Sequence, residues 1–167
     1  LIRLERLIKI CDYSQVSMNL LLATLLIDEQ DSHEYFSHKY NISNNIKDNL
    51  NSLARNLKKI KEDKDFFNKD LEKNIYLNDK NYLITLNILN FTTNPRIKFK
   101  DFSDTLDKIL KSKTRKLNID GKYLIENGMQ QGTLMGKALK EIEEEWMKNN
   151  FQITKERVKE IIRSYSN

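Results

Sequence analysis

The 167-residue chain has one cysteine, one proline and four glycines, and no long hydrophobic run. Its single cysteine, Cys11, can form neither an internal disulfide nor a cysteine metal site, which fits a reducing cytoplasm. The longest apolar run, residues 20–27, is too short to span a bilayer, so we expect no membrane association. A P-loop, a dinucleotide-binding fingerprint, a nucleophile elbow and a His-x-x-x-His motif are also missing. These absences argue against an independent enzyme.

Scarce glycine and proline, with apolar residues at spacings of three and four, predict an all-α fold of about eight to ten helices and no β-sheet. We expect helices at 1–11, 14–28, 31–39, from Ser43 to about residue 60, 66–76, 79–91 and 99–112, and three more within 119–162. The breaks should fall near 41–43, 93–96 and 128–133. A helical body, 1–112, would then precede a helical tail, 113–167. A net charge of +5 modestly favours a polyanionic partner.

Helix 1–11 should turn its apolar side inward and its charged side to water: Leu4, Leu7, Ile8 and Cys11 inward, and Arg3, Glu5, Arg6 and Lys9 outward. Helix 14–28 is the most apolar and should occupy the centre of the core. Asp31 and Glu34 have the spacing of a capping box for the next helix. His33 and His38 point about 140° apart on a helix and cannot share a metal, so we interpret them as surface or boundary residues.

The helix from Ser43 has apolar residues at alternating steps of four and three: Ile46, Leu50, Leu53, Leu57 and Ile60. An ordinary core face is the better interpretation, and a coiled-coil seam is the alternative. Its basic residues, Lys47, Arg55, Lys58, Lys59 and Lys61, could follow RNA phosphates but are typical of a solvated face. Asp63 and Asp65 have the spacing of a metal-binding aspartate pair in nucleotidyl transfer. They lack the hydrophobic strand that would aim both carboxylates at one point, so we predict no catalytic or metal site.

The last 50 residues carry clear helix boundaries. Asp120 should cap a short helix, and Gly128 should follow its end with a positive φ angle. Thr133 should be the N-cap of a longer helix with Leu139, Ile142 and Trp146 on its buried stripe. Thr154 should cap the final helix, whose buried face would carry Val158, Ile161 and Ile162.

This stretch resembles the C-terminal end of bacterial class II CCA-adding enzymes (tRNA nucleotidyltransferases) and the related bacterial poly(A) polymerases. The matching residues are Asp120-Gly121, Tyr123-Leu124-Ile125, Gly128, Gly132, Gly136, Ala138-Leu139, Ile142-Glu143 and Trp146, with a weaker match at Ile42-Ser43-Asn44. The chain departs from the family pattern in the order of Asp120 and Gly121. It also has Gln130-Gln131 where the family has a proline turn.

The resemblance implies a parent protein that adds CMP and AMP from CTP and ATP to the 3′ end of tRNA with Mg²⁺. That chemistry would belong to an N-terminal head and neck preceding this chain, and the chain itself would hold tRNA without cofactor or catalysis. The same region of a poly(A) polymerase is one alternative, and a helical protein-interaction module without RNA binding is another.

The candidate RNA contacts lie near the start of the helix at Thr133. Lys137 and Lys140 occupy its first two turns, where the helix dipole disfavours positive charge. An external phosphate bound at Gly132 and Thr133, with room left by Gly136, would explain this arrangement. Ion pairs of Lys137 with Glu141 and of Lys140 with Glu144 are the alternative. Four basic residues close in sequence would extend the patch: Lys113, Arg115, Lys116 and Lys122.

Overall fold

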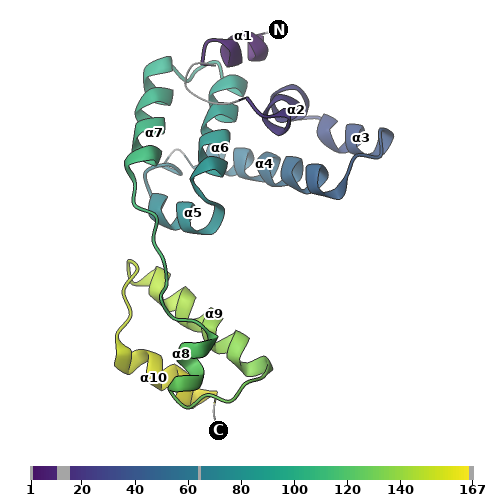
Figure 1. Cartoon of the computed structure of the whole chain (residues 1–167). Coiled ribbons are helices and arrows are strands. Elements are labelled where there is room, and N and C mark those ends of the chain that lie inside the picture. Colours follow the sequence, from purple (N-terminus) through teal and green to yellow (C-terminus); the bar gives the residue numbers. More distant parts are fainter. Residues whose placement is uncertain (1, 11–15, 64, 166–167) are drawn as a thin grey trace. The chain divides into compact units, whose positions relative to one another are not determined.

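The computed structural model describes residues 2–10, 16–63 and 65–165. These residues form ten helices and no strand, which confirms the all-α prediction (Figure 1). The chain divides into two compact units, Leu1–Lys113 and Thr114–Asn167. Among the described residues, none of the helices combines the length and the apolar character needed to cross a bilayer.

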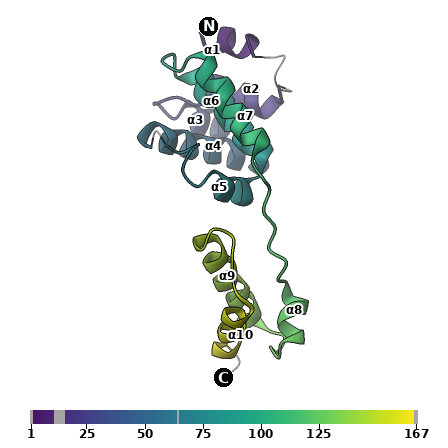
Figure 2. The same ribbon diagram turned by 90° about the vertical axis from the view of Figure 1, so that its left-hand side faces the viewer.

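Seven helices build the first unit, and two buried clusters hold them together. Their bounds are α1 Ile2–Ile8, α2 Met18–Leu26, α3 Ser32–Lys39, α4 Asn44–Glu62, α5 Leu71–Asn78, α6 Lys80–Thr93 and α7 Phe99–Lys111. The prediction that helix 14–28 occupies the centre is wrong, because α6 carries eight buried residues and α2 only three. Helix α6 packs against α1, α2, α4, α5 and α7 (Figure 2). A helix surrounded in this way needs buried residues on nearly all sides, which an amphipathic pattern does not reveal.

The α4 stripe is an ordinary core face. Leu50, Leu53, Leu57 and Ile60 are buried in one cluster with residues of α2, α5, α6 and α7, and Ile46 packs against it. At the end of α4, Asp63 and Asp65 are exposed, and the Asp65 backbone N–H donates to Asp63 Oδ1 at 2.9 Å. The Asp63 carboxylate is therefore engaged by the backbone of Asp65.

The predicted orientation of helix 1–11 is partly wrong. Ile8 is 70% exposed. Arg3 and Arg6, predicted to face water, lie partly buried and donate hydrogen bonds to distant backbone carbonyls. Their long side chains satisfy carbonyls at the ends of α2 and α6, which the spacing along α1 could not indicate. Cys11 lies outside the described residues.

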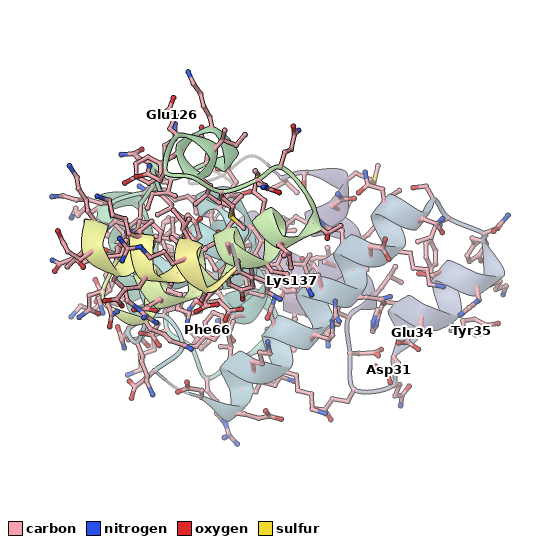
Figure 3. All side chains as sticks on the ribbon, turned by 90° about the horizontal axis from the view of Figure 1, so that it is seen from below. Asp31, Glu34, Tyr35, Phe66, Glu126 and Lys137 are labelled. Carbon is pink, nitrogen blue, oxygen red and sulfur yellow. The ribbon has the colours of Figure 1, made fainter. Side chains whose placement is uncertain are left out.

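The capping box predicted at Asp31 is also absent. Asp31 has a left-handed backbone with φ of 53°, and its side chain makes no capping hydrogen bond. Asp28 takes that role, because its Oδ1 accepts from the Ser32 backbone N–H at 3.1 Å and its Oδ2 from the Ser32 hydroxyl at 2.6 Å. These hydrogen bonds favour the charged form and lower the pKa of Asp28. Asp31 and Glu34 are both exposed (Figure 3).

The two histidines differ in environment. His38 is exposed, as predicted for a surface residue, whereas His33 is only 3% exposed and is therefore a buried residue. Farther along the chain, the helix predicted at 66–76 begins later, at Leu71. Asp70, directly before it, has a left-handed backbone, which interrupts a helix.

The second unit contains α8 Gly121–Glu126, α9 Thr133–Lys148 and α10 Lys155–Ser164, packed around one buried cluster. Asp120 and Thr154 cap α8 and α10 as predicted, accepting from the backbone N–H of Tyr123 and Arg157. Gly128 has φ of +95°, also as predicted. Trp146 is 6% exposed, which confirms its place in the core.

Candidate nucleic-acid interface

The start of α9 is open, and within the described part of the chain no side chain caps it. The predicted N-cap Thr133 is wrong, because Gly132 is the N-cap residue and Thr133 is the first residue of the helix. Glycine has no side chain to accept from the first amides, and the first turn of α9 carries no acidic residue. A Cβ atom at Gly132 or Gly136 would meet nothing within 4 Å. Internal packing therefore does not require these glycines, and the space beside them is free for an external group.

Two lysines project from the first two turns of this helix. Lys137 and Lys140 are exposed, and Figure 3 labels Lys137. Lys140 lies 4.0 Å from Glu144, an exposed pair that contributes little to stability. Lys137 has no ion pair within the described part of the chain, and Glu141 accepts a hydrogen bond from the Tyr165 hydroxyl at 2.7 Å instead. The ion-pair explanation thus accounts for Lys140 but not for Lys137.

Helix α8 packs against the first turn of α9. A Cβ atom at Gly121 would lie only 3.1 Å from Met135 Sδ, so the two helix starts are in close contact. Lys122 follows Gly121, is exposed, and lies 4.0 Å from Glu126 in another weak surface pair. The structure therefore brings Lys122 to the same end of α9 as Gly132 and Thr133.

Arg115 lies at the other end of α9. Its guanidinium is 5.5 Å from the ring centroid of Phe151, and that ring packs edge to face on Trp146 with centroids 4.8 Å apart. Thirteen residues of helix separate Thr133 from Trp146, which is about 20 Å at 1.5 Å per residue. The eight predicted contacts are therefore not a single cluster in the structure. Lys116 is an exposed neighbour of Arg115, and Lys113 is the last residue of the first unit.

The acidic half of α9 is engaged in contacts with α10. Arg157 Nε donates to both carboxylate oxygens of Glu145, at 2.8 and 3.0 Å, and Nη1 donates to Glu160 at 3.0 Å. This pairing lowers the pKa of Glu145 and raises that of Arg157. The hydrogen bond to Glu141 likewise raises the pKa of Tyr165. Glu141 and Glu145 of α9 thus contact the α10 segment, while the lysines of α9 face solvent.

The first unit offers a larger cavity that does not favour a polyanion. Its volume is about 1300 Å³, and six acidic and four basic side chains line it. Lys58 and Lys61 of α4 lie on this side, and Lys61 is 3.6 Å from Glu29. The basic residues of α4 therefore do not form one continuous phosphate track. No group of three or more histidine, cysteine or acidic side chains within the described ranges has the arrangement of a metal site.

Comparison with known families agrees with this architecture. The family model described as tRNA nucleotidyltransferase domain 2 matches residues 13–162, nearly the whole chain. No curated protein and no solved structure matches the chain. The chain therefore belongs to the tRNA nucleotidyltransferase domain 2 family.

Proposed function

We propose that this chain is a non-catalytic tRNA-binding region of a CCA-adding tRNA nucleotidyltransferase. The parent protein would add CMP and AMP from CTP and ATP to the tRNA 3′ end, in the cytoplasm, through an N-terminal head that binds Mg²⁺. Membership of the tRNA nucleotidyltransferase domain 2 family supports tRNA as the partner. The described residues would not bind Mg²⁺ themselves, because they contain no cluster of side chains that could hold a metal ion. The chain's own contribution would be to bind and position tRNA.

The observation that carries the binding proposal is the uncapped start of α9. Its first amides have no side-chain acceptor, its first turn has no acid, and Lys137 has no ion pair among the described residues. Backbone N–H groups at a helix N-terminus attract an anion, and lysines close by strengthen that attraction. A tRNA phosphate is the group that fits. Such contacts position a nucleic acid without reading its sequence.

The remaining predicted contacts would extend this surface in two directions. Lys122 adds a charge beside the start of α9, whereas Arg115 and Lys116 lie near its other end. Two phosphate contacts about 20 Å apart are compatible with one RNA backbone. The proposed contact residues are therefore Lys113, Arg115, Lys116, Lys122, Gly132, Thr133, Lys137 and Lys140.

The test replaces Lys137 and Lys140 together by glutamine and measures tRNA affinity at several salt concentrations. Losing two phosphate contacts should weaken binding and make the slope of log affinity against log salt shallower by up to about two. The matched control is Lys155→Gln with Lys159→Gln, which removes two exposed positive charges from α10. Equal effects of both double variants would contradict the assigned site. Complete absence of tRNA binding would instead favour a protein-interaction module.

The non-catalytic role has its own test. The chain should incorporate neither CTP nor ATP into tRNA in the presence of Mg²⁺, and incorporation that depends on the chain would refute the proposal. A poly(A) polymerase remains the second candidate, because the two enzyme types share this region in the family resemblance. Nucleotide choice by the parent protein, CTP and ATP or ATP alone, separates them.

A further inference from the structure

A second groove lies on the first unit, between α4 and α5. It has a volume of about 410 Å³, within the range of sites for small ligands. One wall comes from α4, where Ser52, Arg55 and Lys59 recur along a single face. The opposite wall comes from α5, where Asn74 and Asn78 are four residues apart.

The charge of this groove is of one sign. Arg55 and Lys59 contribute two positive charges, and no acidic side chain is among the described residues that line it. Arg55 also lines the larger cavity, where acids outnumber bases, whereas Lys59 lines this groove and not that cavity. Both cations are exposed, and neither has an ion pair in the described part of the chain. The groove is therefore suited to bind an anionic group.

The α5 wall presents hydrogen-bond acceptors of fixed orientation. Asn74 Nδ2 donates to the Phe66 carbonyl at 3.3 Å, and Asn78 Nδ2 donates to the Asn74 carbonyl at 3.2 Å. A carbonyl oxygen can only accept, so each amide must direct its NH₂ group inward to the protein. Both Oδ1 atoms are then left as acceptors without a protein donor among the described residues. They fit a ligand that carries N–H groups.

Apolar surface completes the groove. Phe66 is partly buried, packs against the main core cluster and lies edge to face with Phe67, with ring centroids 5.2 Å apart. Its position is therefore fixed by packing, and it also lines the groove. Leu77, from the α5 wall, is 55% exposed. A flat ring can stack on such a surface.

We propose that this groove binds one nucleotide unit, with the phosphate at Arg55 and Lys59 and the base against Phe66. Asn74 and Asn78 would accept from the exocyclic amino group of the base. A free nucleotide and one unit of an RNA strand share this chemistry. The site is on the first unit and does not depend on the phosphate contact proposed at α9.

The experiment uses the full chain and follows amide NMR shifts during titration with AMP. The matched ligands are purine riboside 5′-monophosphate, which lacks the amino group, and inorganic phosphate. AMP should bind severalfold more tightly than purine riboside monophosphate and more tightly again than phosphate. Shifts should concentrate on α4 and α5. A strand of oligoadenylate that binds more tightly than AMP would identify the natural ligand as RNA, whereas equal binding would identify a free nucleotide.

Three double variants decide the assignment. Arg55→Gln with Lys59→Gln should weaken AMP binding about tenfold, because charge-assisted hydrogen bonds are lost. Lys58→Gln with Lys61→Gln removes the same charge from the same helix on the side of the larger cavity and should leave AMP binding unchanged. Lys137→Gln with Lys140→Gln should also leave AMP binding unchanged. The groove and the proposed phosphate contact at α9 are therefore tested independently. Absence of AMP binding, or equal weakening by the two α4 variants, would overturn the proposal.

Discussion

Arg6 should stabilise the first unit far more than a surface arginine does. Its Nε donates to the Phe91 carbonyl at 2.8 Å, and its Nη2 donates to the carbonyls of Ile97 at 2.6 Å and Asn94 at 3.3 Å. These carbonyls lie in and just after the last turn of α6, where a positive charge also complements the helix dipole. The guanidinium stacks 3.9 Å from the Phe91 ring centroid. Arg6→Met would remove all of these interactions while keeping an unbranched apolar side chain.

The expected cost follows from these contacts. Hydrogen bonds to a charged group contribute about 1.5–3 kcal/mol to stability when they are desolvated. Because Arg6 is only partly buried and water reaches it, we expect about 1 kcal/mol from each of its two short hydrogen bonds. The longer bond contributes less, and the cation–π contact adds about 0.5–1 kcal/mol. Arg6→Met should therefore lower the free energy of unfolding of the first unit by about 3 kcal/mol.

Urea denaturation provides the measurement. Far-UV circular dichroism follows all helices, whereas fluorescence of Trp146, the only tryptophan, follows the second unit. Arg6→Met should shift the dichroism transition and leave the fluorescence transition in place. Arg6→Lys should recover less than half of the loss, because one ammonium group cannot match the planar fork of donors. Lys9→Met, at an exposed position of the same segment, is the control. A cost of Arg6→Met no greater than that of Lys9→Met would contradict the role assigned to Arg6.

Two further predictions concern the second unit. Trp146→Ala should destabilise it by about 3–5 kcal/mol, since it empties a buried site and removes the partner of Phe151. A normal dichroism transition for this variant, with only tRNA binding lost, would show that the ring contacts RNA instead. The second prediction is pH dependence. Because Arg157 lowers the folded-state pKa of Glu145, this stabilisation is complete above the unfolded-state value of 4.5 and declines as pH falls through the lower folded value. In thermal melts, Arg157→Gln should therefore reduce the loss of stability on acidification below pH 4.5, and an unchanged acid profile would argue against the pair.

Local features of the fold could be predicted because their causes are local. Asp120 and Thr154 each accept from an amide three residues ahead, so residue type and position suffice to identify the cap. Gly128 has the positive φ angle that ends a helix, which glycine adopts at little cost. The buried stripe of α4 follows from apolar spacing alone.

The candidate sites depended on contacts that sequence spacing does not encode. Lys137 and Lys140 are one turn apart, so their common surface was predictable, but Arg115 stacks on a ring 36 positions later and joins the other end of α9. The α4–α5 groove was missed for the same reason. The only sequence signals were polar residues recurring at helical spacing in each helix, and such residues also form ordinary solvated faces.

The sequence by itself therefore determined the helical class, the family, most helix ends and the inward sides of α4 and α10, since these follow from composition, motif and periodicity over a few residues. Tertiary structure decided which helix became central and which charged side chains were withdrawn from water. Arg6 binds carbonyls 85 to 91 residues away. Asp31 has a left-handed backbone, and Asp28 caps the start of α3 in its place. In both cases the hydrogen-bond partner is a backbone group that the fold would otherwise leave unsatisfied. Buried polar groups need such partners, and only the tertiary structure determines which side chains are near enough to provide them.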